Sequence, residues 1–385
     1  MNSNWRHNAV GLEDEKQREA QKVMKVVFVL PTVNMSGGLR VVAIYAAALT
    51  ERGHEVTLVS PPPRQMPFRR KIFSLATGRG WPTPTAKKPS HIDELKVEHR
   101  VLDRWRPVEN RDIPDSDVII ATWWETAEWV NNLKSSNGAK IYFVQGHEIY
   151  PHLPVGRCKA TYRMPFHKIV VSKWLADIML REYGDPFVDL VPNSVDHQLF
   201  FAPERGKQNR PTIGFLYSKS SNKGVDVSLE VIRRLHGRFP NLRVISFGTT
   251  NPSWSKEQSE LIEFNCLPPQ HVIRNLYSEC DVWLTTSRME GFNLTAIEAM
   301  ACRTPVVSTN TGWPADAVVI GHNGALCDVD DVVGLTQGVE CILAMSDAEW
   351  RTVSENAFAT VKNSSWTTSA NLFEAALQHA CQRAA

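Results

Sequence analysis

Short β-branched runs alternate with amphipathic stretches of helical length along most of this chain. The run VMKVVFVL at residues 23–30 has no polar alternation, which is typical of a strand that is covered on both faces. The stretch LRVVAIYAAALTER at residues 39–52 follows with helical spacing and ends at Gly53, a common helix stop. This β–α alternation predicts a parallel sheet with helices on both of its faces.

The alternation occurs twice, so the sequence predicts an α/β protein with two domains. In the first half, further strands are expected at residues 55–60, 117–122, 140–145, 168–172 and 187–192. In the second half, strands are expected at residues 211–218, 241–248, 281–287, 304–309 and 324–329, and helices at 224–239 and 268–280. A length of 385 residues agrees with two domains of roughly 100–200 residues each.

The predicted boundaries divide the chain into four parts. They are an N-terminal extension at residues 1–23, a Rossmann-like domain at 24–205, a second Rossmann-like domain at 206–364 and a C-terminal helix at 365–385. We expect the two domains to face each other across a cleft, and the last helix to pack back on the first domain. Ligands of such sheets bind beyond the carboxyl ends of the strands, which places the expected site in the cleft.

Charge and composition argue against several classes of protein. The formal net charge is only +2, which does not indicate nucleic-acid binding. No run approaches the roughly 18 apolar residues of a transmembrane helix, and the first 22 residues are too polar for a secretory signal. The seven cysteines are scattered without a CxxC pair, which favours reduced thiols over a zinc site or a disulfide framework. We therefore expect a cytoplasmic protein without a metal site.

Residues 61–90 interrupt the alternation with a basic, proline-rich segment. They contain seven Lys or Arg residues, seven prolines and no Asp or Glu. A structureless segment of this length is usually either functional or disordered. One interpretation is a solvated loop, and another is a surface that contacts the inner face of an anionic membrane or a lipid-phosphate acceptor. A third interpretation, nucleic-acid binding, lacks a recognisable module.

The segment SRMEGFNLTAIEAMACRTP at residues 287–305 places two carboxylates around the start of an apolar helix. Gly291 permits a tight turn, and a helix that begins near Asn293 would point its free N–H groups into the cleft, which suits a diphosphate. Glu290 would lie at the mouth and Glu298 roughly 7–8 Å along the helix axis, where each can hold a different sugar. The alternative is that Glu290 only caps the helix electrostatically and that Glu298 faces water.

The stretch EGFNLTAIE at residues 290–298 resembles the E-x7-E motif of the retaining glycosyltransferases of family 4 (glycosyl transferases group 1), which have the GT-B fold. Other stretches resemble segments of that family in the same order. They are MSGGLRVV (35–42), VVSKWLADIML (170–180), VPNSVDHQLF (191–200), NKGVDVSLEVI (222–232), QHVIRNLYSECDVWLTTSRMEGF (270–292) and TNTGWPADAVVIGHNGALCDVDD (309–331). The resemblance covers about residues 24 to 380. It implies that the first domain binds the acceptor and the second the nucleotide sugar.

The resemblance also implies a role for individual residues. Glu298 would bind the ribose of the nucleotide, Glu290 would contact the donor sugar, and Lys223 would neutralise the diphosphate. Backbone amides after the first glutamate would meet sugar and phosphate, which implicates Gly291, Phe292, Asn293 and Leu294. A fixed cation and fixed amide donors would stabilise the charge that develops on the leaving diphosphate.

Some positions depart from the family pattern. The arginine that often precedes the lysine–glycine pair is replaced by Ser218, and the adjacent Lys219 lacks the bidentate fork of a guanidinium group. The contact to the second phosphate therefore stays open. Ser194 stands where a glycine is usual, and the double glycine of the closing turn is Gly312-Trp313 here.

Residues of the first domain are expected to complete the site. Gly37 and Gly38 follow the first strand, where a glycine turn lets backbone amides approach the donor phosphate or the acceptor. They are not part of a G-x-G-x-x-G motif, and the next strand ends at Ser60 without an acid, so NAD is a poor candidate ligand. The resemblance places a donor-contacting histidine or acid in YFVQGHEIYPHLP at residues 142–154, which makes His147 a catalytic candidate. The alternative for His147 is that it only stabilises its loop.

Two other features of the first domain have a simple structural interpretation. Trp123 and Trp124 follow a predicted strand and either line the acceptor side of the cleft or pack in the core. Ser172 precedes a helical stretch and is expected to be its N-cap.

Together these features predict a retaining glycosyltransferase. It would move a sugar from a nucleoside-diphosphate sugar to a glycan or lipid-linked acceptor, in the synthesis of a surface polysaccharide or another glycoconjugate. The resemblance implies that no metal cofactor is needed. Alternatives are a nucleotide-sugar epimerase of the same fold and a non-catalytic subunit that binds a sugar nucleotide, whereas a dehydrogenase is disfavoured.

Overall fold

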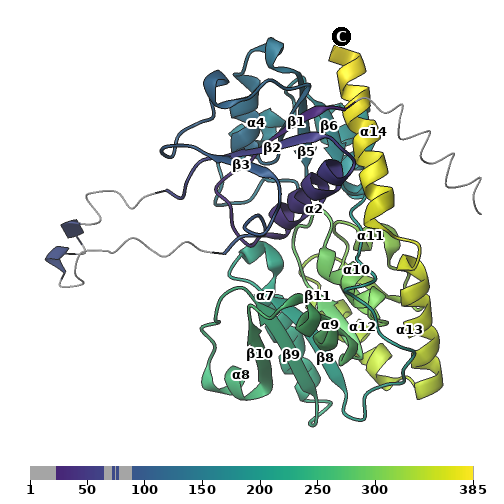
Figure 1. Ribbon diagram of the computed structural model, residues 1–385. Coiled ribbons are helices and arrows are strands. Elements are labelled where there is room, and N and C mark those ends of the chain that lie inside the picture. Colours follow the sequence, from purple (N-terminus) through teal and green to yellow (C-terminus); the bar gives the residue numbers. More distant parts are fainter. Residues whose placement is uncertain (1–22, 65–71, 74, 78–88, 385) are drawn as a thin grey trace, which may run out of the picture.

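The computed structural model describes residues 23–64, 72–73, 75–77 and 89–384. Figure 1 shows two α/β domains, one above the other, with the long helix α14 (Trp366–Ala384) along the side of the upper, N-terminal domain. This arrangement confirms the predicted fold, including the C-terminal helix that returns to the first domain. Apart from Val23, the predicted N-terminal extension lies outside the described residues, and so does most of the basic segment 61–90.

Seven parallel strands form the N-terminal sheet in the order β3-β2-β1-β4-β5-β6-β7. They are β1 (Lys25–Val29), β2 (Glu55–Ser60), β3 (Glu98–Val101), β4 (Val118–Ala121), β5 (Ala139–Val144), β6 (His167–Val170) and β7 (Val188–Leu190). The helices of this domain are α2 (Gly37–Glu51), α4 (Trp124–Asn131), α5 (Val155–Thr161) and α6 (Lys173–Tyr183), with 3-10 turns at Asn110–Asp112 and Ser135–Asn137. Strand β1 pairs with β2 on one side and with β4 on the other, so the strand order reverses there.

Six parallel strands form the C-terminal sheet in the order β10-β9-β8-β11-β12-β13. They are β8 (Thr212–Tyr217), β9 (Arg243–Gly248), β10 (Ile262–Cys266), β11 (Val282–Thr285), β12 (Val306–Thr309) and β13 (Gly324–Cys327). The helices are α7 (Val225–His236), α8 (Lys256–Leu261), α9 (Gln270–Ser278), α10 (Leu294–Ala301), α11 (Pro314–Ala317), α12 (Val332–Ala344) and α13 (Asp347–Val361), with a 3-10 turn at Ser221–Lys223. Here the order reverses at β8, which pairs with β9 and with β11.

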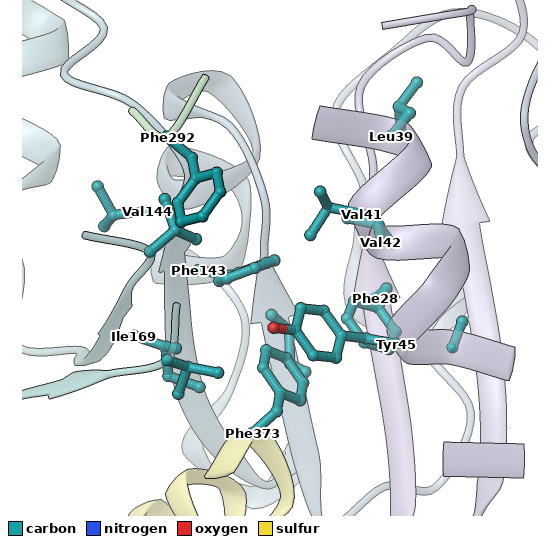
Figure 2. Close-up of a cluster of buried hydrophobic side chains, with 14 of the residues drawn as sticks. Phe28, Leu39, Val41, Val42, Tyr45, Phe143, Val144, Ile169, Phe292 and Phe373 are labelled. Carbon is teal, nitrogen blue, oxygen red and sulfur yellow. The ribbon is translucent and has the colours of Figure 1, made fainter. Parts of the chain in front are cut away.

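Helix α14 completes the core of the N-terminal domain, where it packs on α2 and β5. Phe373 is fully buried and stacks on Tyr45 of α2 with 4.2 Å between ring centroids, and Phe143 of β5 meets it edge-on at 5.1 Å (Figure 2). Glu374, the next residue, is also buried and pairs with Arg52 Nη1 at 2.7 Å. The last helix therefore supplies both apolar and charged contacts to the first domain.

Some elements differ from the prediction. Strands β3 and β10 have no predicted counterpart, because both are edge strands whose sequences, EHRV and IEFNC, lack the continuous apolar run of a central strand. Helix α2 begins at Gly37 rather than after the glycines, because Ser36 caps it by accepting a hydrogen bond from Leu39 N. Gly37 and Gly38 therefore form the first turn of the helix instead of a separate glycine turn.

Candidate active site

A cleft of about 620 Å³ lies between the carboxyl ends of the two sheets. The N-terminal wall consists of the start of α2 and the loops after β1, β4 and β5, and the C-terminal wall of the loops after β8, β9 and β11. Both points of strand reversal border this cleft, as expected for a ligand site in such sheets. The predicted site residues that line it are Gly37, Gly38, Ser218, Lys223, Glu290, Gly291, Phe292, Asn293 and Leu294.

Helix α10 points its N-terminus into the cleft. Its N-cap, Asn293, has a φ of 80°, in the left-handed region that asparagine tolerates better than most residues. Asn293 Oδ1 accepts a hydrogen bond from Ala296 N at 3.3 Å, and its Nδ2 donates to Thr285 Oγ1 at the end of β11, at 3.1 Å. These contacts fix the first turn of α10 beside the cleft, where the helix dipole favours an anion.

Glu290 and Lys223 meet on the C-terminal wall. Lys223 Nζ lies 2.5 Å from Glu290 Oε1, and Ser287 Oγ donates to the same oxygen at 2.7 Å. Gly224 follows Lys223 with a φ of 59°, and a Cβ atom there would collide with Thr286 O at 2.0 Å. The tight turn at Gly224 thus aims Lys223 at the cleft, and one cation and one carboxylate stand beside the start of α10.

Gly291 brings the two domains into backbone contact. A Cβ atom on Gly291 would lie 1.7 Å from Gln145 O, which follows β5 in the other domain. The carbonyl oxygen of Gly291 accepts a hydrogen bond from Ser172 Oγ at 2.7 Å. Ser172 also caps α6 by accepting from Leu175 N at 3.2 Å, which confirms the predicted N-cap. Any residue larger than glycine at position 291 would therefore push the domains apart.

Glu298 lies on α10 but does not line the cleft. Its Oε1 pairs with Arg40 Nη1 of α2 at 2.5 Å, and its Oε2 accepts a hydrogen bond from Tyr277 OH at 2.8 Å. Glu298 is only 4% exposed, so the alternative in which it faces water is wrong. In this conformation both of its oxygens are occupied by protein groups.

Consecutive residues after β5 have different surroundings. His147 is buried outside the lining of the cleft, and its Nε2 lies 2.6 Å from Tyr183 OH of α6. Burial lowers the pKa of His147. The structure thus gives its imidazole no direct contact with the cleft, and its bonds match the alternative of a histidine that stabilises its loop. Glu148, in contrast, is one of the lining residues.

The other sequence-based candidates divide between cleft and core. Trp123 lines the cleft, whereas Trp124 is buried. The Cζ atom of Arg157 lies over the Trp124 ring, 4.9 Å from the ring centroid. Ser218 lines the cleft, but Lys219 is exposed and lies outside the lining. In this conformation Lys219 therefore does not occupy the place of the missing arginine.

Sequence reasoning missed three residues that shape the site: Arg40, Gln145 and Asn193. Gln145 and Asn193 line the cleft, and within the described part of the chain Gln145 Oε1 and Asn193 Oδ1 are buried without a hydrogen-bond partner. Buried polar atoms normally find a partner, so these two are available to a ligand. Their position at or directly after the end of a predicted strand, at 140–145 and 187–192, is the signal that could have identified them.

All seven cysteines lie in the described residues, and no two of them are joined by a disulfide there. Over the same residues, no group of three or more His, Cys, Asp or Glu side chains is arranged to hold a metal ion. None of the helices in the described part combines the length and the apolar character that a membrane span requires.

The sequence of residues 197–358 matches the family described as Glycosyl transferases group 1. This segment contains the whole C-terminal sheet and every predicted donor-binding residue of the second domain. A D-inositol 3-phosphate glycosyltransferase from Rhodococcus opacus is 32% identical over 178 residues, which cover 40% of this chain and 40% of the relative. The chain thus spans about two fifths of the length of this curated relative.

Two solved structures resemble the chain over nearly its whole length. Sucrose-phosphate synthase from Thermosynechococcus elongatus superposes with a TM-score of 0.68 at 17% identity, covering 92% of this chain and 98% of that one. A mutant of S. aureus TarM, in complex with Fondaparinux, alpha-GlcNAc-glycerol and UDP, superposes with a TM-score of 0.70 at 11% identity, covering 92% and 100%. At such low identity the likeness concerns the fold. The chain therefore has the GT-B fold, and its residues 197–358 match the glycosyl transferases group 1.

Proposed function

We propose that this protein is a retaining glycosyltransferase of family 4 that moves a sugar from a nucleoside-diphosphate sugar to a glycan or lipid-linked acceptor. One observation carries the proposal. The N-terminus of α10, Lys223 and Glu290 stand together on one wall of the interdomain cleft, inside the segment that matches the glycosyl transferases group 1. A helix N-terminus and a lysine suit a diphosphate, and a carboxylate suits the hydroxyls of a sugar.

The reaction would depend on charge stabilisation more than on covalent chemistry with the protein. As the bond between the sugar and the diphosphate breaks, negative charge grows on the leaving phosphate oxygen. The Lys223 ammonium group and the amides of α10 would stabilise that charge more in the transition state than in the ground state. The acceptor hydroxyl would attack from the same face and pass its proton to the departing phosphate, so the configuration is retained and no metal cofactor is needed.

Uridine diphosphate is the first nucleotide to test, because the structurally similar S. aureus TarM binds UDP. A ligand that binds only the native state raises the melting temperature. We expect one of UDP, GDP and ADP to stabilise the wild type, and Lys223→Met to abolish most of that shift. Lys256→Met on α8 removes an exposed lysine outside the cleft and serves as the control. The absence of any shift with all three nucleotides would count against the proposal.

Two alternative functions make different predictions in simple assays. An epimerase would convert the donor alone into a new sugar isomer, whereas a transferase requires an acceptor. A non-catalytic subunit would bind the nucleotide but show no turnover with any acceptor. Addition of EDTA separately tests the metal-independent mechanism, which predicts unchanged activity.

Cellular placement is a separate proposal. We infer a cytoplasmic protein that contacts the inner face of a membrane through the basic segment 61–90, whose seven Lys or Arg residues would attract anionic lipids. Deletion of residues 64–88 is expected to weaken sedimentation with anionic vesicles. Equal sedimentation of the deleted and the complete chain would contradict the membrane contact.

A further inference from the structure

Glu148 presents one carboxyl oxygen to the cleft from a fixed position. It lies four residues after the end of β5, lines the N-terminal wall and is 2% exposed. Its Oε2 accepts hydrogen bonds from Trp124 N at 2.7 Å and from Tyr142 OH at 3.2 Å. Over the part of the chain that the structure describes, Oε1 has no such partner, which leaves this oxygen for a ligand.

The backbone around Glu148 is held equally firmly. Tyr162 OH accepts a hydrogen bond from Glu148 N at 2.7 Å and donates one to Gly146 O at 3.0 Å, so a single hydroxyl closes this turn. Tyr162 is itself fully buried and stacks on Tyr142 with 5.6 Å between ring centroids. Supporting contacts of this kind are what keep a binding group in a productive geometry.

Burial favours the protonated, neutral form of the Glu148 carboxyl group. Burial raises the pKa of Glu148 to about 8, against the opposing effect of the hydrogen bonds from Trp124 N and Tyr142. No cation pairs with it among the residues that are described. Because Oε2 accepts two hydrogen bonds, the proton belongs on Oε1, and Glu148 offers an O–H donor to the cleft.

Tyr150 lies near Glu148 on the N-terminal wall and near Glu290 on the opposite wall. Burial raises the pKa of Tyr150, and the proximity of the Glu148 and Glu290 carboxyl groups adds to this effect, so the phenol lies near both of them. All three residues line the cleft. Trp123 lines the same N-terminal wall and provides an aromatic surface of the kind that sugar rings pack against. The space between Glu148 and Glu290 is therefore where an acceptor would meet the donor sugar.

We propose that Glu148 binds a hydroxyl group of the acceptor and so orients a sugar or polyol toward the donor sugar held by Glu290. This inference rests on the glycosyltransferase function proposed above and specifies the acceptor side of the same site. Glu148 is not the base of the reaction. The bond from the sugar carbon to the phosphate oxygen breaks, the bond from the acceptor oxygen to that carbon forms, and the acceptor proton leaves on the diphosphate.

Two substitutions distinguish a purely structural role of Glu148 from a role in acceptor binding. Glu148 also binds the first amide of α4, so its loss weakens the start of that helix. Glu148→Gln keeps an oxygen for Trp124 N and Tyr142 and an N–H donor for the acceptor, but it carries no titratable proton. Glu148→Ala removes all of these contacts, so the two variants distinguish binding from proton transfer.

The experiment uses UDP-glucose as the donor, or the sugar nucleotide selected by the thermal screen, with glycerol as the acceptor probe. It measures the ratio of glucosylglycerol to free glucose released by hydrolysis, together with the Kd for UDP. We expect Glu148→Gln to stay within about threefold of the wild-type ratio and Glu148→Ala to lower it by about tenfold, the effect of one lost hydrogen bond. The Kd for UDP should change by less than about twofold, because Glu148 lies on the opposite wall from Lys223. Glu128→Gln on α4, whose carboxylate pairs with Arg157 at the surface, is the matched control.

Each other outcome decides against a specific part of the scheme. An unchanged ratio of transfer to hydrolysis in Glu148→Ala, with a lower melting temperature, would show that Glu148 only stabilises the start of α4. That result would overturn the inference. If Glu148→Gln lost activity as fully as Glu148→Ala, the residue would act as a base and the inference would also fail. A wild type that neither binds a nucleotide nor consumes a sugar nucleotide would instead refute the proposed function itself.

Discussion

Arg40 and Glu298 form a partly buried ion pair that joins the two domains, with 2.5 Å between Nη1 and Oε1. Arg40 stands on α2 of the first domain and Glu298 on α10 of the second, and their side chains are only 20% and 5% exposed. Glu298 is the residue that the family resemblance assigns to the ribose of the nucleotide. A ribose that binds Glu298 must therefore displace the Arg40 guanidinium or share the carboxylate with it.

Removal of Arg40 should strengthen nucleotide binding. In Arg40→Met the carboxylate of Glu298 keeps its bond from Tyr277 but loses its competitor, so we expect the Kd for UDP to fall by about threefold to tenfold. Isothermal titration calorimetry measures this change. Arg181→Met on α6, which removes an arginine that is 77% exposed, is the control. A higher Kd in Arg40→Met would show that Arg40 belongs to the donor site and does not block it.

Substitution of each glutamate of the E-x7-E motif by alanine should affect a different kinetic or binding constant. Glu298→Ala removes the proposed ribose contact and should raise the Kd for the donor by about tenfold. Glu290→Ala removes the partner of Lys223 at the proposed sugar position and should lower kcat by about a hundredfold with a smaller effect on Kd. Calorimetry and steady-state rates test the two effects separately. Identical behaviour of both variants and of the surface variant Glu279→Ala would remove the assignment of roles.

Gly291 should tolerate no side chain in the conformation described. A Cβ atom at this position would meet Gln145 O at 1.7 Å and Gln145 C at 2.5 Å, and backbone atoms cannot rotate away. We expect Gly291→Ala to hold the domains apart, to lower the transfer rate by at least about tenfold and to destabilise the fold by about 1–3 kcal/mol. Gly156→Ala on α5 is the control, because nothing lies within 4 Å of its added Cβ. Wild-type rates for Gly291→Ala would mean that catalysis does not need this contact.

The sequence predicted the parts of the fold that depend on local patterns. Apolar runs such as KVVFV in β1 identify central strands, and the Ser172 cap follows from its place before a helical stretch. Strands β3 and β10 were not predicted, because edge strands need no continuous apolar run. The α10 motif was found because its candidate site residues are close together in the sequence.

Contacts between distant segments explain what the sequence did not reveal. Arg40 and Glu298 are 258 residues apart, and no spacing rule indicates which side chain of the first domain meets α10. Whether His147 or Glu148 lines the cleft depends on a turn that Tyr162 closes and on Tyr183, which binds the imidazole of His147. Both are tertiary contacts, so adjacent residues that looked equivalent in the sequence have different surroundings.

The buried carboxyl group of Glu148 should make stability depend on pH. Its pKa in the folded state is about 8, against 4.5 as the ordinary value, so between these two pH values the native state retains a proton that the unfolded chain releases. Stability therefore falls as pH rises through this window. Glu148→Gln does not titrate. The free energy of unfolding of the variant minus that of the wild type should therefore increase from pH 5.5 to 7.5, with an upper limit of about 5 kcal/mol over the whole window.

The tyrosine and cysteine side chains that face Glu148 do not titrate in this pH window. Burial raises the pKa of Tyr142, Tyr162 and Tyr150, and raises that of Cys158 to about 11, so all four stay neutral below pH 8. The adjacent His147, whose pKa is lowered by burial, is present in both proteins and contributes to both stability curves. Urea unfolding at pH 5.5, 6.5 and 7.5 measures the effect. Parallel stability curves for Glu148→Gln and wild type would show that Glu148 is ionised throughout, because only a proton held by the folded state makes the two curves diverge.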